Sequence, residues 1–310
     1  MFDVLAITAP IFIIIGLGYL ASALKLLSRE QVRGVGTFVI IFCLPALVIH
    51  ALADRPISEV FNAHYLLAYG MASLGSFTAG FMVFRRTRQA SVANAAIAGM
   101  GMSVSNSGFI GYPIAAMVAG PPAVVALALG MIIENLVMIP VALALAEAGE
   151  QQGGSARRIV IETLKRLGKN PLIVSIIIGG GLSLAGVRIP TAPLKVIEML
   201  AQASAPAALF VIGGVLFGTR VRGQLNELGV IGAGKLLLHP GLVALLFWLL
   251  GDIPAPMMLA GVVIAAAPMM SVYPILGQRF GLEGRCAAAL VLTTLASFFT
   301  ISAVLMVAHL

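Results

Sequence analysis

Charge is scarce in this sequence. Only 10% of its 310 residues are Asp, Glu, Lys or Arg, whereas 60% are hydrophobic, and the mean hydropathy is +1.06. A soluble globular domain carries about 25% charged residues. The composition therefore excludes a soluble domain and predicts an all-α membrane protein that crosses the bilayer several times.

Cysteine and enzyme motifs are also scarce. Cys43 and Cys286 fall in or beside apolar runs, which argues against a disulfide framework or a cysteine metal site. The net charge is +7, but the basic residues form short clusters without an aromatic platform, so we expect no nucleic-acid partner. Paired Asp-rich motifs, HExxH, GxSxG and a P-loop are missing. We therefore expect no catalytic residues, no cofactor and no metal, and we give a membrane-embedded enzyme little weight.

Apolar runs fill most of the chain, and each is close to the roughly 17 to 25 residues that a membrane helix needs. We interpret the first as a retained helix, because it is long for a signal peptide and no basic residues precede it. The ten runs are 4–24, 36–53, 65–84, 91–119, 122–146, 171–187, 196–218, 228–250, 256–276 and 286–307.

The basic residues predict the orientation. Fifteen of the 19 lie in alternate connections between the runs, Arg55, Arg188 and Lys195 lie in the other connections, and Lys235 lies within a run. Because cytoplasmic loops are enriched in Lys and Arg, we expect an inner (cytoplasmic) membrane protein with both termini outside. Segment 150–170 is then a cytoplasmic linker that ends in a basic amphipathic helix on the anionic leaflet.

Internal similarity divides the chain into two halves. Three short matches occur in the same order at offsets of 161 or 163 residues: "IIIGLG" at 13–18 with "IIIGGG" at 176–181, "LPAL" at 44–47 with "APAA" at 205–208, and "YP" at 112 with "YP" at 273. We infer two five-helix repeats, residues 1–149 and 171–310. Because five is odd, the repeats enter the membrane from opposite sides, a common transporter construction.

Two stretches place helix-breaking residues inside apolar runs: "SNSGFIGYP" at 105–113 and "APMMSVYP" at 267–274. A single such stretch ordinarily marks a kink or close packing, but two in corresponding positions of inverted halves point to a binding site. Pro113 and Pro274 suit the first turn of a restarted half-helix. We expect the breaks to cross near the midplane with two positive helix ends facing an anion. Carbonyl ends of the first half-helices also point inward, which leaves a cation as the alternative.

Glu134, in "MIIENLVMIP", is the one acidic residue near the middle of a run. An intramembrane carboxyl group is a functional hypothesis by default, and a protonated packing residue is the alternative. Asn135 could hydrogen-bond either form of Glu134. Lys235 and His239 of "GKLLLHP" are candidate partners, although Lys235 is near enough the cytoplasmic end to extend to the interface. We predict that a proton gradient drives transport through Glu134.

Four motifs together resemble the auxin efflux carrier family in its short prokaryotic form: "SNSGFIGYP", "KNPLIV" at the start of the sixth run, "GKLLLHP" in the eighth and "AAAPMMSVYP" in the ninth. The resemblance covers essentially the whole chain. It implies the fold of sodium/proton antiporters and bile-acid symporters, with ten transmembrane helices, two inverted repeats, and broken, crossing fourth and ninth helices. Helices 1, 2, 6 and 7 would form a scaffold and a homodimer surface, and the others a mobile unit that moves as an elevator.

The resemblance and the two breaks together assign the site residues. The expected substrate-binding residues are Asn106, Ser107, Gly108, Gly111, Tyr112, Pro113, Pro268, Met269, Ser271, Tyr273 and Pro274. The expected coupling residues are Glu134, Asn135, Lys235 and His239.

The function that we expect is secondary transport of small organic anions, namely carboxylates such as malate or malonate, or auxin-like acids. A proton or a sodium ion is the candidate coupling ion. The alternative is a cation/proton antiporter or sodium-coupled symporter of the same fold. An antiporter would need acidic residues at the crossing, where Asn106 and Met269 stand.

Overall fold

A computed structural model of the chain describes residues 2–53, 61–149, 161, 165, 168–217 and 225–308. Throughout these residues the regular structure is helical, apart from an isolated antiparallel bridge between Ser105 and Met269. Within the described ranges, six helices are long and apolar enough to cross a membrane: Arg29–Ala53, Ala63–Thr87, Pro122–Gly149, Thr191–Leu216, Leu225–Leu250 and Glu283–Ala308. The prediction of an all-α, multi-pass membrane protein is therefore confirmed. Most of the predicted linker lies outside the described residues.

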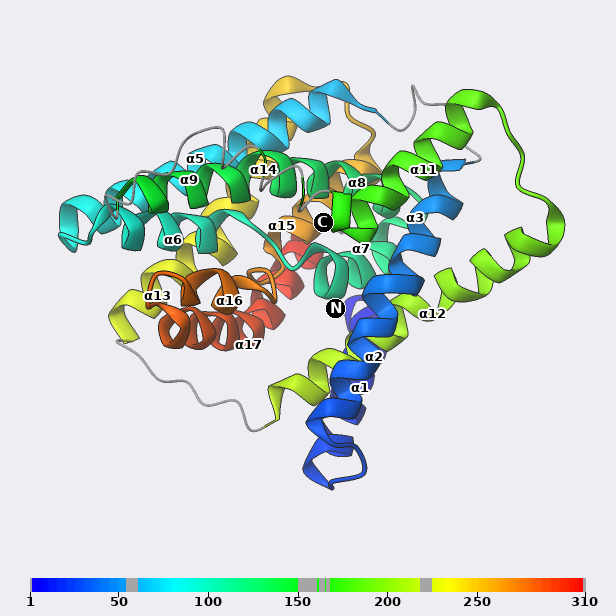
Figure 1. Ribbon diagram of the computed structural model, residues 1–310, viewed down its shortest axis with the longest axis horizontal. Helices are drawn as coiled ribbons and strands as arrows, with labels where there is room; N and C mark the ends of the chain where they lie inside the picture. Colours follow the sequence, from blue (N-terminus) through cyan, green and yellow to red (C-terminus); the bar gives the residue numbers. More distant parts are fainter. Residues whose placement is uncertain are drawn as a thin grey trace.

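The helices form two groups (Figure 1). In the first, which we call the α12 group, the long helix α12 packs against α1, α2, η1 and α3, and α11 packs on α3. Figure 1 shows these helices together on one side of the molecule. The members of the α12 group are α1 (Phe2–Ala23), α2 (Arg29–Phe38), η1 (Val39–Cys43), α3 (Leu44–Ala53), α11 (Pro171–Ala185) and α12 (Thr191–Leu216).

The second group, the α15 group, is built around α15, which packs against α7, α8, α14 and α17, while α6 packs between α5 and α9. Its members are α5 (Ala63–Thr87), α6 (Val92–Ser103), η2 (Ser107–Gly111), α7 (Tyr112–Ala119), α8 (Pro122–Ile133), η3 (Glu134–Met138), α9 (Ile139–Gly149), α13 (Leu225–Ala233), η4 (Gly234–Leu238), α14 (His239–Leu250), α15 (Ala255–Ala266), α16 (Tyr273–Gln278) and α17 (Glu283–Ala308). Contacts between the groups include α12 with η2 and α7, and α3 with α8.

Glycine allows α1 and α12 to approach closely. A Cβ atom at Gly18 would overlap the carbonyl oxygen of Phe210, and one at Gly213 would overlap the carbonyl oxygen of Ile15. Helices in a bilayer associate mainly through van der Waals packing, which small residues permit. We infer that these two glycines fix the α1–α12 contact.

Each of the four π-helical turns in the described residues ends two residues before a proline. The residue just before the proline donates its N–H to the carbonyl five residues earlier. Proline has no N–H, and in an α-helix its ring clashes with the carbonyl four residues earlier. The wider turn accommodates this defect without ending the helix. The four turns are η1, η2, η3 and η4, followed by Pro45, Pro113, Pro140 and Pro240.

Two helices are interrupted in the regions that the sequence marks. The helix α6 ends at Ser103, Val104 is extended, and the helix resumes at Ser107; α15 ends at Ala266 and the helix resumes at Tyr273. The interruptions meet, because the Asn106 N–H donates to the Pro268 carbonyl at 2.7 Å beside the Ser105–Met269 bridge. The backbone groups freed by one break are thus paired with the other, as burial requires.

The prediction for Pro113 needs a correction, whereas that for Pro274 holds. Pro274 lies in the first turn of α16. The first restarted helix begins six residues before Pro113, at Ser107, and the η2 turn accommodates that proline. The restarted helix α16 has only six residues, so it aligns few peptide dipoles. The positive helix ends at the crossing are therefore unequal.

Candidate functional site

Two cavities adjoin the crossing, and the same two polar residues line both. The first, of about 570 Å³, has walls from α2, η1 and α12 on one side and η2, α16 and α17 on the other. The second, of about 460 Å³, lies between η1, α11, η3 and the two interruptions. Asn106 and Ser271 line both cavities, and the Asn106 Nδ2 donates to the Ser271 Oγ at 2.9 Å. Since each cavity has walls from both groups, this pair faces the junction between them.

The first cavity, which we call the Arg33 cavity, is largely apolar. Its polar side chains are Arg33 and Thr37 from α2, Asn106 and Ser271 from the interruptions, and Thr294 from α17. The second, the Glu134 cavity, is richer in polar groups. Those groups are Ser105, Asn106, Ser107, Glu134, Asn135, Lys169, Asn170 and Ser271.

Glu134 is held by residues on both sides of Asn106. Its side chain is only 3% exposed, and its Oε1 accepts hydrogen bonds from the Ser107 hydroxyl at 2.7 Å and the Ser105 N–H at 3.1 Å. The Tyr69 hydroxyl lies at 3.5 Å from the same oxygen. The η3 turn begins at Glu134 and so places its carboxyl group against the first interruption. These bonds therefore attach Glu134 to both neighbours of Asn106.

Lys235 is completely buried, which rules out the alternative that its side chain extends to the membrane interface. Its Nζ donates to the Ala265 carbonyl at 2.5 Å and to the Ser105 hydroxyl at 2.9 Å. The positive charge therefore lies at the carboxyl end of α15, where the helix dipole favours a cation. Lys235 does not pair directly with Glu134 in the described structure; Ser105 contacts both.

His239 extends this network to α5. The Lys235 Nζ lies 3.2 Å from the His239 Nδ1, and the His239 Nε2 lies 3.0 Å from the Ser73 hydroxyl. Because an ammonium group only donates hydrogen bonds, Nδ1 accepts and the Nε2–H donates to Ser73 when Lys235 is charged. The Tyr69 ring packs edge-on against the imidazole. The network therefore connects α5, η3, η4, the start of α14, the end of α15 and the first interruption.

Asn135 does not bind Glu134 as we expected. Its Nδ2 donates to the Met131 carbonyl at 2.9 Å, and its Oδ1 accepts from the Asn170 Nδ2 at 3.2 Å. The Oδ1 of Asn170 in turn caps the start of α11, accepting from the Leu172 N–H at 3.0 Å. Asn135 therefore joins η3 of the α15 group to α11 of the α12 group.

The predicted substrate residues separate into two sets. The first set lines one or both cavities: Asn106, Ser107, Gly108, Ser271 and Pro274. The second set lines neither cavity: Gly111, Tyr112, Pro113, Pro268, Met269 and Tyr273.

Members of the second set hold the interrupted helices in place. The fully buried Tyr273 donates its hydroxyl to the Ile97 carbonyl at 2.9 Å. A Cβ atom at Gly101 would lie 2.6 Å from that hydroxyl oxygen, and one at Gly111 would lie 3.1 Å from the Ile264 Cα. Pro268 and Met269 join the two interruptions through their backbones.

Sequence reasoning missed several residues of the site. Ser105 was part of the quoted motif but was not assigned a role, and Tyr69, Ser73 and Arg33 carried no local signal. Asn170 could have been found, because an Asn-Pro pair at the start of an apolar run predicts a helix cap. No group of three or more His, Cys, Asp or Glu side chains is placed to hold a metal within the described ranges.

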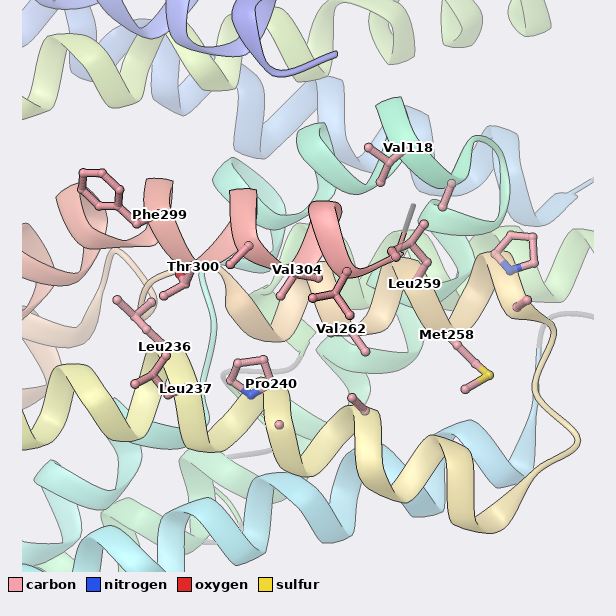
Figure 2. Close-up of a pocket in the computed structure, with 18 residues that line it drawn as sticks. Val118, Leu236, Leu237, Pro240, Met258, Leu259, Val262, Phe299, Thr300 and Val304 are labelled. Carbon is pink, nitrogen blue, oxygen red and sulfur yellow. The ribbon is translucent and has the colours of Figure 1, made fainter. Parts of the chain in front are cut away.

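A larger cavity lies elsewhere and has different chemistry. It measures about 920 Å³ and lies between η4, α14, α15, α17 and the end of α7. Figure 2 shows mainly apolar side chains around it, including Leu236, Val262 and Val304, with Thr300 as the polar exception. Leu237 and Phe299 on its rim are 63% and 71% exposed. It offers no charge to select a small ion, so the two cavities at the crossing form the better candidate site.

Comparison with known proteins agrees with this architecture. Residues 3–306 match the family described as "Membrane transport protein". A Rhizobium meliloti (strain 1021) protein named "Putative malonate transporter" is 29% identical over 309 residues, which are 98% of this chain and 96% of that protein. The Escherichia coli (strain K12) protein named "Uncharacterized transporter YfdV" is 25% identical over 211 residues, 66% of each chain. The chain therefore belongs to the membrane transport protein family, the auxin efflux carrier family that its motifs resemble.

Proposed function

We propose that this membrane transporter carries small organic anions, namely carboxylates such as malate or malonate, by an elevator-type secondary mechanism. The observation that carries the proposal is the position of Asn106. Its amide lies in an interruption of a membrane helix, is 7% exposed, and lines both cavities between the helix groups. An amide N–H can donate to a carboxylate without bringing a full charge into the membrane.

Apart from the Glu134 carboxyl group, which is bonded to Ser105 and Ser107, the groups at the crossing favour an anion over a cation. A cation site would draw on carbonyl oxygens at the ends of the first half-helices, but the Lys235 ammonium already binds the Ala265 carbonyl there. In the other half, the Ser76 hydroxyl donates to the Met102 carbonyl at 2.8 Å. The restarted helix at Ser107 contributes the positive end of a dipole. A cation/proton antiporter or a sodium-coupled symporter is therefore the second choice.

The two helix groups support the elevator mechanism and the ten-helix, inverted-repeat fold that we propose with it. The α12 group corresponds to the scaffold and homodimer surface of the family fold, and the α15 group corresponds to the mobile unit. Asn106, Ser271 and Glu134 belong to the mobile unit, whereas the opposite walls of both cavities belong to the scaffold. Movement of the α15 group would therefore carry the bound anion past the stationary α12 group, from one side of the membrane to the other.

Glu134 is our candidate for coupling to protons. The residues that donate to its carboxyl group, Ser105 and Ser107, are the two neighbours of Asn106. A proton on the Oε2 of Glu134 neutralises the carboxyl group and leaves Oε1 as an acceptor, so the bonds from Ser105 and Ser107 weaken next to the substrate amide. This contact provides a route by which protonation and substrate occupancy influence each other.

The proposal is tested with proteoliposomes and a panel of labelled mono- and dicarboxylates, with and without imposed ion gradients. We expect Asn106→Ala to weaken the apparent affinity at least tenfold, because a hydrogen bond to a charged group contributes about 1.5 to 3 kcal/mol. Asn226→Ala, on the exposed start of α13, is the matched control and should behave as the wild type.

Two results would contradict the proposal. If the wild type takes up sodium ions or exchanges them for protons but carries no carboxylate, the antiporter becomes the better interpretation. If a folded Asn106→Ala protein keeps wild-type affinity, the anion binds away from the crossing.

A further inference from the structure

Arg33 is the single charged side chain among the residues that line the Arg33 cavity. It lies on α2, whose start is fixed by a capping box in which Ser28 and Gln31 bond each other's backbone N–H. Its own guanidinium has no hydrogen bond or ion pair with any other described residue. Arg33 is exposed, and a guanidinium at the edge of a mostly apolar cavity can bind an anion, because it forms two parallel hydrogen bonds with a carboxylate.

Asn106 and Ser271 line the same cavity from the opposite helix group. One N–H of the Asn106 amide is engaged by Ser271, which leaves its second N–H available to a ligand. The cavity therefore presents two different recognition groups. One is a full positive charge on the α12 group, and the other is a neutral hydrogen-bond donor on the α15 group.

We propose that Arg33 binds the second carboxylate of a dicarboxylate whose first carboxylate is held at Asn106, and that Arg33 thereby selects dianions over monoanions. This inference rests on the proposed function and specifies its substrate class. A cavity of about 570 Å³ is within the usual range for small-molecule sites. A monocarboxylate of the same size uses the Asn106 end alone and gains nothing specific from the guanidinium.

The arrangement also predicts a directional effect. Arg33 belongs to the α12 group, which is stationary in the elevator mechanism, whereas Asn106 moves with the α15 group. The second carboxylate must therefore leave Arg33 when the α15 group moves. Arg33 strengthens binding from the side of the membrane to which this cavity opens, and it does not contribute after the movement.

The test compares malonate with monomethyl malonate, which is similar in size but has one charge fewer. Binding of each is measured by calorimetry on the purified full-length transporter. We expect Arg33→Gln to weaken malonate binding at least tenfold and to change monomethyl malonate binding by less than twofold. Arg33→Lys, which keeps the charge, should recover part of the preference for malonate. Arg29→Gln removes a charge one turn earlier on α2, at a residue that does not line this cavity, and should leave the preference intact.

The outcomes separate this inference from the proposed function. Equal weakening of both ligands by Arg33→Gln would show a general attraction of anions and overturn the inference. Unchanged malonate binding by that variant would overturn it as well, while the proposed function would stand. If the wild type binds neither ligand nor any other carboxylate, the proposed function fails and the inference fails with it.

Discussion

Replacing Glu134 with glutamine isolates the proton from the rest of the site. Glutamine has nearly the same shape as a protonated glutamic acid, and its Oε1 can still accept the bonds from Ser107 and Ser105. It cannot release a proton. We therefore expect Glu134→Gln to keep substrate binding and exchange but to lose the accumulation driven by an inward proton gradient.

The effect of the substitution on the hydrogen bonds within the site follows from two close contacts. The Glu134 Oε1 accepts from the Ser107 hydroxyl at 2.7 Å and from the Ser105 N–H at 3.1 Å. A hydrogen bond to a charged group contributes about 1.5 to 3 kcal/mol, and a neutral one about 0.5 to 1.5 kcal/mol. Glutamine should therefore weaken these bonds by roughly 2 to 3 kcal/mol in total relative to the ionised carboxylate. Relative to the protonated form the change should be close to zero.

Two measurements on the same proteoliposomes check this prediction. Counterflow exchange of labelled malonate reports binding and the conformational cycle, and uptake under an imposed pH gradient reports coupling. The exchange affinity of Glu134→Gln should be independent of pH and should match that of the wild type at low pH, where Glu134 carries its proton. Glu283→Gln, at an exposed carboxylate at the start of α17, is the control and should retain gradient-driven uptake.

One result would refute the reasoning. If Glu134→Gln still concentrates malonate in response to a pH gradient, the proton is carried elsewhere or not at all. Glu134 would then be a packing residue that anchors the first interruption, and a uniporter or another ion site would be the better interpretation.

The remaining predictions concern Lys235, the two prolines and the topology. Lys235→Met keeps the side-chain volume but leaves the Ala265 carbonyl without its buried cation, so it should lower the free energy of unfolding by about 2 to 4 kcal/mol. Thermal unfolding in detergent measures this loss. The control is Lys195→Met, at a 68% exposed lysine on α12, which should change the unfolding temperature very little. Pro274→Ala should retain transport, because the first turn of α16 loses no hydrogen bond. Pro113→Ala removes the cause of the η2 turn beside Asn106 and should therefore slow exchange. Equal transport rates for the two variants would contradict this prediction. A reporter fused after residue 310 should be periplasmic and one inserted at residue 153 cytoplasmic, and a cytoplasmic C-terminus would overturn the predicted inverted repeats.

Much of this protein could be predicted from local properties of the chain. The lack of charge determined that the chain lies in a membrane, since few soluble folds could bury so much apolar surface. The motifs at 105–113 and 267–274 marked the regions in which two helices are interrupted. Pro268 lies inside the second interruption, whereas Pro113 lies beyond the first and accompanies the η2 turn. The same motifs indicated the family. Proline also explains the π-helical turns, because each turn ends two residues before a proline. The sequence therefore contained this signal, but we had not anticipated such a turn at Pro113.

The partners of the polar residues were decided by the tertiary structure. Ser105 and Lys235 are 130 residues apart, and Asn106 and Ser271 are 165 apart. Helical periodicity says which residues share a face of one helix, but it does not say which face of another helix they meet. For this reason the sequence left open whether Lys235 extends to the interface or meets Glu134, and the structure buries it at the end of α15. Arg33 and Asn106 line one cavity because two separately packed helix groups meet there, and only the packing of those groups decides that contact.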